Sequence, residues 1–180
     1  MTILCAGIKH EGRSVLSLED LHETFQVNFF AAAELAAWIC GRQDLGDRAT
    51  TALALVLISS MGRWHGMPSS CGYNASKAAL SIWGESLDME LRRRGGPRSR
   101  VTVVEPGMFA SGMTRVTPLT RLLFVSRQGV ASRIVSGALA GKRVIRPPLW
   151  FALLTWGLCL AGRDLRYHLL ARARPDVDRP

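Results

Sequence analysis

The chain has 180 residues, of which 48% are hydrophobic and 21% are charged, and its formal net charge is +9. This balance excludes a disordered chain and indicates a globular domain long enough to bury a core. The positive charge permits contact with phosphates, nucleic acid or anionic lipid. The arginine-rich stretch 92–100 has no interleaved aromatic residues and no recognition motif, so nucleic acid is not an expected partner.

The cysteines and the N-terminus bear on the expected compartment. Cys5, Cys40, Cys71 and Cys159 lack the paired spacing of a metal site, which predicts free thiols in a reducing compartment. No basic stretch followed by an apolar core opens the chain, so no secretory signal is expected. The sequence therefore predicts a cytoplasmic protein, which would lie at the periphery of a membrane if its tail binds one.

The first expected elements are a short strand and a long helix. Residues 2–6 are apolar and precede Gly7, which predicts a buried strand and a turn. Residues 17–40 predict a helix that starts at a capping box, ends at a glycine and turns an apolar side inward. Asn28 falls among its apolar positions and is either a functional residue or a plain surface asparagine.

Residues 53–94 hold the strongest functional pattern in the chain. The apolar run 53–58 predicts a buried parallel strand, and a loop rich in Gly, Pro and Ser follows it. A helix is expected from about Tyr73 to Arg94. His65 lies in the loop between strand and helix, and is either a plain loop residue or part of a substrate pocket.

Ser60, Tyr73 and Lys77 together suit proton transfer. Ser60 ends the strand, where ligands bind in open α/β sheets, and the spacing of four places Tyr73 and Lys77 on one helix face. A tyrosine with its ordinary pKa of about 10 is a poor acid or base at neutral pH, and we expect the Lys77 ammonium to lower that pKa. Ser60 can hydrogen-bond the oxygen where charge develops. None of these groups transfers electrons, so a hydride carrier is needed.

The elements after residue 100 complete an α/β pattern. Residues 101–104 predict a buried strand that ends at a Pro-Gly turn. Residues 112–126 predict a flexible loop over the substrate, 128–140 a helix, and 143–146 a last strand.

The motif Tyr73-Asn-Ala-Ser-Lys77, with Ser60 thirteen residues upstream and the turn Pro106-Gly107 downstream, resembles the active-site signature of the short-chain dehydrogenases/reductases. The resemblance spans about residues 3–146. It implies an α/β fold, the C-terminal portion of a Rossmann-like, doubly wound parallel sheet. It also implies an oxidoreductase that uses NAD or NADP to interconvert an alcohol and a carbonyl on a hydrophobic small molecule, as a homodimer or tetramer.

The resemblance also assigns roles to individual residues. Those it implies to be catalytic are Asn28, Ser60, Tyr73 and Lys77, with Asn28 holding a water near the lysine. Those it implies to contact the cofactor are Gly7, Tyr73, Lys77, Pro106, Gly107, Phe109 and Ser111. In the family the helix that carries the tyrosine often packs at a dimer interface; packing against the protein's own sheet is the other interpretation.

Two departures from the family pattern concern the cofactor site. Leu4 and Cys5 stand where the family has two asparagines, and the 180 residues hold no Gly-rich turn of the kind that binds a dinucleotide pyrophosphate. The resemblance implies that the chain begins at the family's fourth strand. Three explanations for the absent Gly-rich turn stay open: a misplaced start codon, a fragment, or a protein that has lost the cofactor half. Under the last two, the chain would be a non-catalytic remnant or a peripheral membrane protein that cannot bind cofactor alone.

Residues 147–180 are expected to form a tail apart from the domain 1–146. The uncharged run 147–162 is shorter than the roughly 20 residues that span a bilayer. Arginines flank it, and Trp150 and Trp156 suit a membrane interface. The tail is either a monotopic or re-entrant membrane attachment, or an ordinary buried helix or lid over the substrate.

Overall fold

The computed structural model describes residues 1–10, 17–41, 53–68, 70–95, 99–107, 109 and 125–172. The expected surface loop 42–52 and most of the expected substrate loop 112–126 lie outside this part. Within the described residues, four strands form one parallel sheet in the order β1-β2-β3-β4: β1 (Thr2–Leu4), β2 (Ala54–Ile58), β3 (Arg100–Val104) and β4 (Val144–Ile145).

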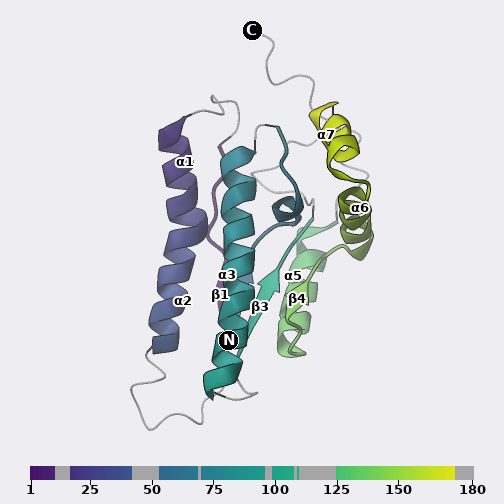
Figure 1. The fold of residues 1–180 in the computed structure, drawn as a ribbon. Coiled ribbons are helices and arrows are strands. Elements are labelled where there is room, and N and C mark those ends of the chain that lie inside the picture. Colours follow the sequence, from purple (N-terminus) through teal and green to yellow (C-terminus); the bar gives the residue numbers. More distant parts are fainter. Residues whose placement is uncertain are drawn as a thin grey trace.

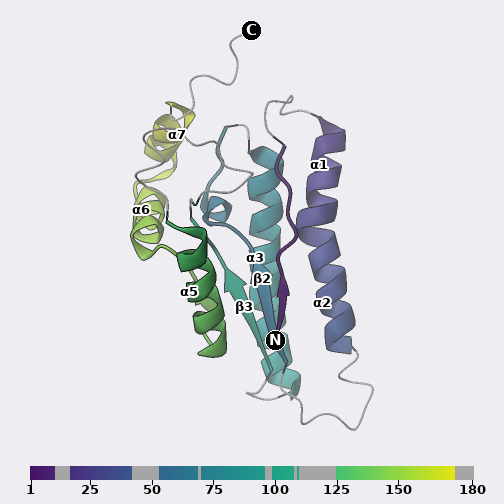
Figure 2. The same cartoon turned by 180° about the vertical axis from the view of Figure 1, so that it is seen from behind.

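The helical segments lie between and after the strands (Figure 1). They are α1 (Leu18–Phe25), the π-helical η1 (Gln26–Phe30), α2 (Ala31–Gly41), the 3₁₀-helical η2 (Met61–Trp64), α3 (Cys71–Gly95), α5 (Arg127–Leu139), α6 (Leu149–Leu160) and α7 (Arg163–Arg172). Figures 1 and 2 show α3 in front of the sheet in one view and α5 in front in the other. Helices thus cover both faces of a parallel sheet, and the predicted α/β class is confirmed.

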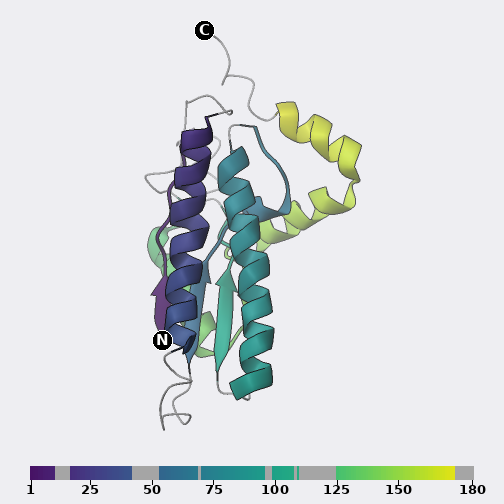
Figure 3. The same cartoon turned by 60° about the vertical axis from the view of Figure 1, so that its left-hand side comes forward.

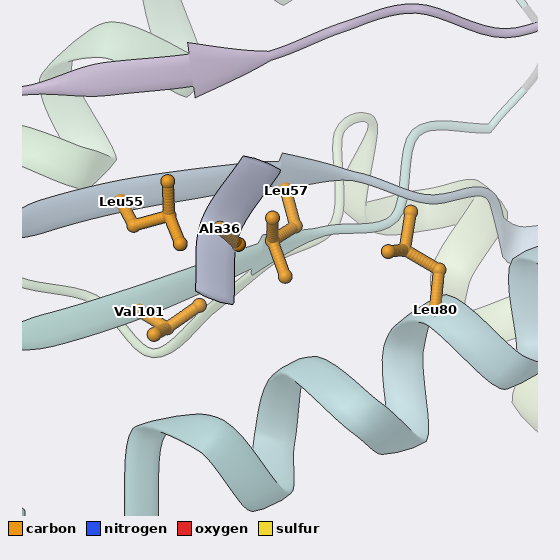
Figure 4. Close-up of a cluster of buried hydrophobic side chains, with 5 residues drawn as sticks. All are labelled: Ala36, Leu55, Leu57, Leu80 and Val101. Carbon is orange, nitrogen blue, oxygen red and sulfur yellow. The ribbon is translucent and has the colours of Figure 1, made fainter. Parts of the chain in front are cut away.

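Two apolar clusters lie on the two faces of the sheet, because successive strand residues point to opposite sides. One cluster joins the sheet to α2 and α3 and consists of Ala36, Leu55, Leu57, Leu80 and Val101 (Figure 4). The other joins the sheet to α5 and consists of Val56, Val104, Ala138 and Ile145. The strand β2 is therefore buried on both faces, as its continuous apolar run predicted.

Helix α3 comes close to the sheet because of a glycine. A Cβ atom on Gly84 would lie 2.7 Å from Cδ1 of Leu57 and 3.0 Å from Cγ2 of Val103. Asp88, one turn further along, accepts a hydrogen bond from the backbone N–H of Val101 at 2.8 Å. This side chain links the C-terminal half of α3 to the start of β3.

The segment predicted as one long helix contains a π-helical turn. Ser17 caps it as expected, since its hydroxyl accepts from the backbone N–H of Asp20 at 3.2 Å. The π-helical turn spans Gln26–Phe30, and Asn28 at its centre is fully buried. Leu21 and Leu35 fit the apolar side of this helical pattern, but both are exposed.

The C-terminal tail forms two helices that leave the sheet. Figure 3 shows α6 and α7 projecting to the side, away from α1, α2 and α3. Among the described residues, no helix combines the length and the apolar character that crossing a bilayer requires. All four cysteines lie in the described part, and none forms a disulfide.

Candidate active site

Ser60 is fixed at the carboxyl edge of the sheet by the residues on either side of it. The backbone N–H of Ser59 donates to the carbonyl of Val104 at 2.7 Å, and that of Met61 donates to the carbonyl of Pro106 at 3.0 Å. The pairing of β2 with β3 thus continues beyond the strands. The Ser60 hydroxyl caps η2 by accepting from the N–H of Gly62 at 3.1 Å.

Tyr73 lies in the first turns of α3, with its hydroxyl close enough to Ser60 for the serine to influence its pKa. Burial raises the pKa of Tyr73 above its ordinary value, and Ser60 opposes this shift with a smaller effect. The prediction that Lys77 lowers this pKa is therefore wrong for this structure. Loss of water around the phenol disfavours the phenolate more than the neighbouring groups favour it.

Lys77 is buried one helical turn after Tyr73. Its ammonium donates to the carbonyl of Ile58 at 2.9 Å and lies 5.9 Å from the centroid of the Tyr73 ring. Burial lowers the pKa of Lys77 to about 8, and the nearby Cys5 acts in the opposite direction. A lysine with this pKa can gain and lose a proton close to neutral pH, which an ordinary lysine does not do.

The lowered pKa of Lys77 predicts how stability depends on pH. Between about pH 8 and the ordinary pKa of 10.5, the unfolded chain holds a proton on Lys77 that the folded chain has released. The free energy of unfolding should therefore rise from about pH 8 to about pH 10, by about 2 kcal/mol from this group. Tyr73, whose raised pKa lies above its ordinary 10.0, begins to act only beyond that window.

Urea unfolding of the chain and of Lys77→Met across that pH range checks this prediction. The variant should lack the rise, while Lys142→Met, which changes an exposed lysine, should keep it. If the free energy of unfolding rises with pH as steeply in Lys77→Met as in the unchanged chain, the lowered pKa of Lys77 is contradicted.

A buried serine pair, which sequence reasoning missed, holds Lys77 from behind. The Ser59 hydroxyl donates to the carbonyl of Lys77 at 2.8 Å, and the Ser81 hydroxyl donates to Ser59 at 2.6 Å. The sequence signal for Ser59 is the pair of serines that follows the apolar run 53–58, in which only Ser60 was assigned a role. These bonds join the end of β2 to the N-terminal half of α3. They therefore hold Ser60 and Lys77 at a fixed distance from each other.

Asn28 and Gly7 meet Lys77 from the other side. The Asn28 side chain accepts from the N–H of Ile8 at 2.7 Å and donates to the carbonyl of Ile8 at 2.9 Å, as a strand neighbour would. It also donates to Ser76 at 3.1 Å, which ties the π-helical turn to α3. A Cβ atom on Gly7 would lie 3.2 Å from the Lys77 nitrogen and 3.3 Å from the Asn28 oxygen. The structure therefore brings these three residues together.

The other expected cofactor residues lie next to this group or outside the described part. Pro106 adjoins it through the bond from Met61. Gly107 lies against α6 instead, because a Cβ atom there would be 2.6 Å from the Phe151 ring. Phe109 is half-buried and pairs with Val125 in an isolated parallel bridge. Ser111 lies outside the described residues.

For His65, a plain loop residue and a part of a substrate pocket both remain predictions. Its carbonyl accepts from the Asn74 side chain at 3.1 Å, which fixes the loop against the start of α3. Burial lowers the pKa of His65, and the charge of Arg166 in α7 lowers it further. The tail thus comes near the loop that precedes Tyr73.

A buried charge cluster beside the site was also missed by sequence reasoning. Glu105 is fully buried directly after β3, and its two oxygens contact Arg63 at 2.6 Å and Arg146 at 2.7 Å. The Trp64 indole donates to the same carboxylate at 3.2 Å, with both guanidinium groups near its ring. An acidic residue between an apolar run and a Pro-Gly turn was the available signal. The cluster fixes η2, the segment that Ser60 caps.

Known proteins resemble this chain in sequence and in fold. The family model described as short chain dehydrogenase matches residues 1–121. A Sesamum indicum protein named 11-beta-hydroxysteroid dehydrogenase A is 30% identical over 144 residues, which cover 67% of this chain and 39% of that protein. An Escherichia coli (strain K12) protein named uncharacterized oxidoreductase YbbO is 28% identical over 167 residues, covering 84% and 58%.

Among solved structures, a short chain dehydrogenase from Burkholderia cenocepacia J2315 in complex with NADP has a TM-score of 0.73 at 20% identity. That comparison covers 93% of this chain and 69% of the other, and shows that the fold is shared. The chain spans less than two thirds of the length of both curated relatives. The family match includes β1, η1 and the Ser60, Tyr73 and Lys77 group, and it covers more than half of the sequence. This chain belongs to the short-chain dehydrogenase family.

Proposed function

We propose that this chain carries the proton-transfer residues of an NAD- or NADP-dependent oxidoreductase, which interconverts an alcohol and a carbonyl on a hydrophobic small molecule. One observation carries the proposal. Tyr73 lies beside Ser60 at the carboxyl edge of a parallel sheet, with the ammonium of Lys77 buried one helical turn away. Ligands bind at this edge in open α/β sheets.

Tyr73 is the proposed general acid. Its hydroxyl is protonated at neutral pH, so in the direction of reduction it can donate a proton to the substrate oxygen, and the Lys77 ammonium, 5.9 Å from the ring centroid, would stabilise the phenolate that forms. The Ser60 hydroxyl would donate a hydrogen bond to the same oxygen, where negative charge develops. Because the pKa of Lys77 is about 8, Lys77 can return a proton to the site near neutral pH. Asn28 would support this relay by holding the chain at Ile8 beside the lysine.

The residues present suit a nucleotide at this edge. Because Gly7 has no side chain, Lys77 and Asn28 lie close to the backbone there, at the edge where the nucleotide is proposed to bind. The Lys77 ammonium has three N–H donors, and the carbonyl of Ile58 accepts a hydrogen bond from one of them. The other donors can point toward a ligand. Gly7, Tyr73, Lys77, Pro106, Gly107, Phe109 and Ser111 are the proposed contacts. When bound, NAD or NADP would accept or supply the hydride. The NADP complex of the Burkholderia structure supports this cofactor class.

The substrate class and the setting belong to the same proposal. The name of the sesame relative supports a bulky apolar substrate such as a steroid-like alcohol. The resemblance supports a homodimer or tetramer and a division into a catalytic part, 1–146, and a tail, 147–180. The four cysteines, none of which forms a disulfide, support a cytoplasmic location.

Fluorescence titration with NADH and NADPH tests the proposal. We expect saturable binding of one of them, and Lys77→Met should weaken it about tenfold through loss of a charge-assisted hydrogen bond. Lys142→Met, at an exposed position, is the matched control and should bind like the unchanged chain. The absence of saturable binding, or equal affinity for Lys77→Met, would contradict the proposed role of Lys77.

A further inference from the structure

Helix α6 has no charged residue, and its two faces differ in what they contact. On the inner face Phe151 lies against Gly107, Thr155 is buried, and the Cys159 thiol donates to the carbonyl of Trp64 at 3.7 Å. The outer face consists of large apolar side chains that are between 42% and 69% exposed: Leu149, Trp150, Leu153, Leu154, Trp156 and Leu160. Their spacing places them along one side of the helix. The helix is therefore held by one face and presents a continuous apolar strip on the other.

Helix α7 adds exposed apolar side chains. Leu165, Tyr167 and Leu169 are exposed there, and Arg163 and Arg166 lie among them in the sequence. Figure 3 shows that α6 and α7 project from the fold as an angled pair, on the side away from the sheet and α1–α3. The described part of the chain leaves this surface uncovered. Contiguous exposed apolar surface of this kind marks a site of interaction.

The charges around the strip have one sign. The basic residues of the stretch 142–172 are Lys142, Arg143, Arg146, Arg163, Arg166 and Arg172, against a single acid, Asp164. Arg146 is paired with the buried Glu105, whereas Arg143 and Arg163 are exposed. Two copies of this surface placed face to face would repel each other. An anionic lipid headgroup layer complements both the charge and the apolar strip.

We propose that α6 and α7 bind the surface of an anionic bilayer, with α6 in the plane of the interface and its outer leucines among the acyl chains. Helix α6 has 12 residues. At 1.5 Å per residue it is about 18 Å long, against a hydrocarbon core of about 30 Å, so it lies along the membrane and does not cross it. Trp150 and Trp156 then occupy the headgroup level, which tryptophan prefers. This inference does not rest on the proposed oxidoreductase function.

Co-sedimentation of the 180-residue chain with phosphatidylcholine vesicles, with and without phosphatidylserine, tests the apolar strip. We expect binding to the vesicles that contain phosphatidylserine. Leu153→Gln/Leu154→Gln should weaken it about tenfold or more, since two exposed apolar side chains no longer enter the bilayer. The matched control is Leu18→Gln/Leu139→Gln, which changes two equally exposed leucines on α1 and α5 and should bind like the unchanged chain.

The contribution of the arginines near the apolar strip is tested by separate variants. Arg163→Gln/Arg166→Gln should reduce the preference for phosphatidylserine, and Arg93→Gln/Arg133→Gln, two exposed arginines elsewhere, should not. Raising the salt concentration should weaken binding of the unchanged chain. Three results would overturn the inference: absence of vesicle binding, equal loss in the strip and control variants, or a self-associated chain that Leu153→Gln/Leu154→Gln converts to monomer without any effect of lipid.

Discussion

Tyr73→Phe is expected to reduce the turnover of carbonyl reduction by about a thousandfold, because the variant keeps the ring and loses the proton donor. Burial holds the Tyr73 hydroxyl protonated at neutral pH, and Ser60 orients it. The loss should therefore appear in kcat, with the affinity for the nucleotide nearly unchanged. Oxidation of NADPH or NADH with a bulky apolar ketone measures the first, and fluorescence titration the second.

The chain offers a matched control for this substitution. Tyr167 is the only other tyrosine and is 70% exposed on α7. Tyr167→Phe removes the same hydroxyl from a surface position and should leave turnover unchanged. Substantial turnover by Tyr73→Phe would refute the proposed general acid, whatever the control does.

Glu105→Ala is expected to lower the free energy of unfolding by about 3 kcal/mol. The substitution removes the carboxylate that both Arg63 and Arg146 contact, and it leaves the Trp64 N–H without its acceptor. Arg63 is largely buried, so water cannot replace the lost partner fully. Chemical denaturation monitored by tryptophan fluorescence gives the difference.

Glu85→Gln is the control for the charge cluster. Glu85 also pairs with Arg63, at 3.1 Å, but it is partly exposed, and such pairs contribute less than about 1 kcal/mol. A loss by Glu105→Ala no larger than that of Glu85→Gln would show that the cluster does not hold η2. Because Ser60 caps η2, a destabilised cluster should also raise KM for the carbonyl substrate.

The sheet and the central trio could be predicted because their signals are local. The apolar run 53–58 has few meanings other than a strand buried on both faces, and the Tyr73 to Lys77 spacing fixes one helix face. The electrostatics could not be predicted in the same way. Spacing shows that Lys77 is near Tyr73, but only the packed structure shows that burial raises the phenol pKa against the smaller opposing effect of Ser60.

Features that depend on distant contacts escaped the sequence for the same reason. Glu105 reads as one acidic residue before a turn, and its partners lie about 40 residues away in each direction along the chain. The apolar composition of the tail leaves both a membrane attachment and a buried helix or lid open. Which side of α6 is covered follows from Phe151 meeting Gly107, a contact that composition does not encode.

The π-helical turn at Gln26–Phe30 has a consequence for rotational phase. Inward-facing side chains recur every fourth position along this helical rod: Asp20, Thr24, Asn28, Ala32 and Ala36. In a regular α-helix a period of four drifts by about 40° per step, which would carry Ala36 roughly 160° away from Asp20. The wider turn accommodates one extra residue and cancels about 100° of that drift. The extra residue therefore keeps the buried side chains of α1 and α2 on one side of the helix, facing the rest of the fold. Asn28 lies in the π-helical turn that makes this possible.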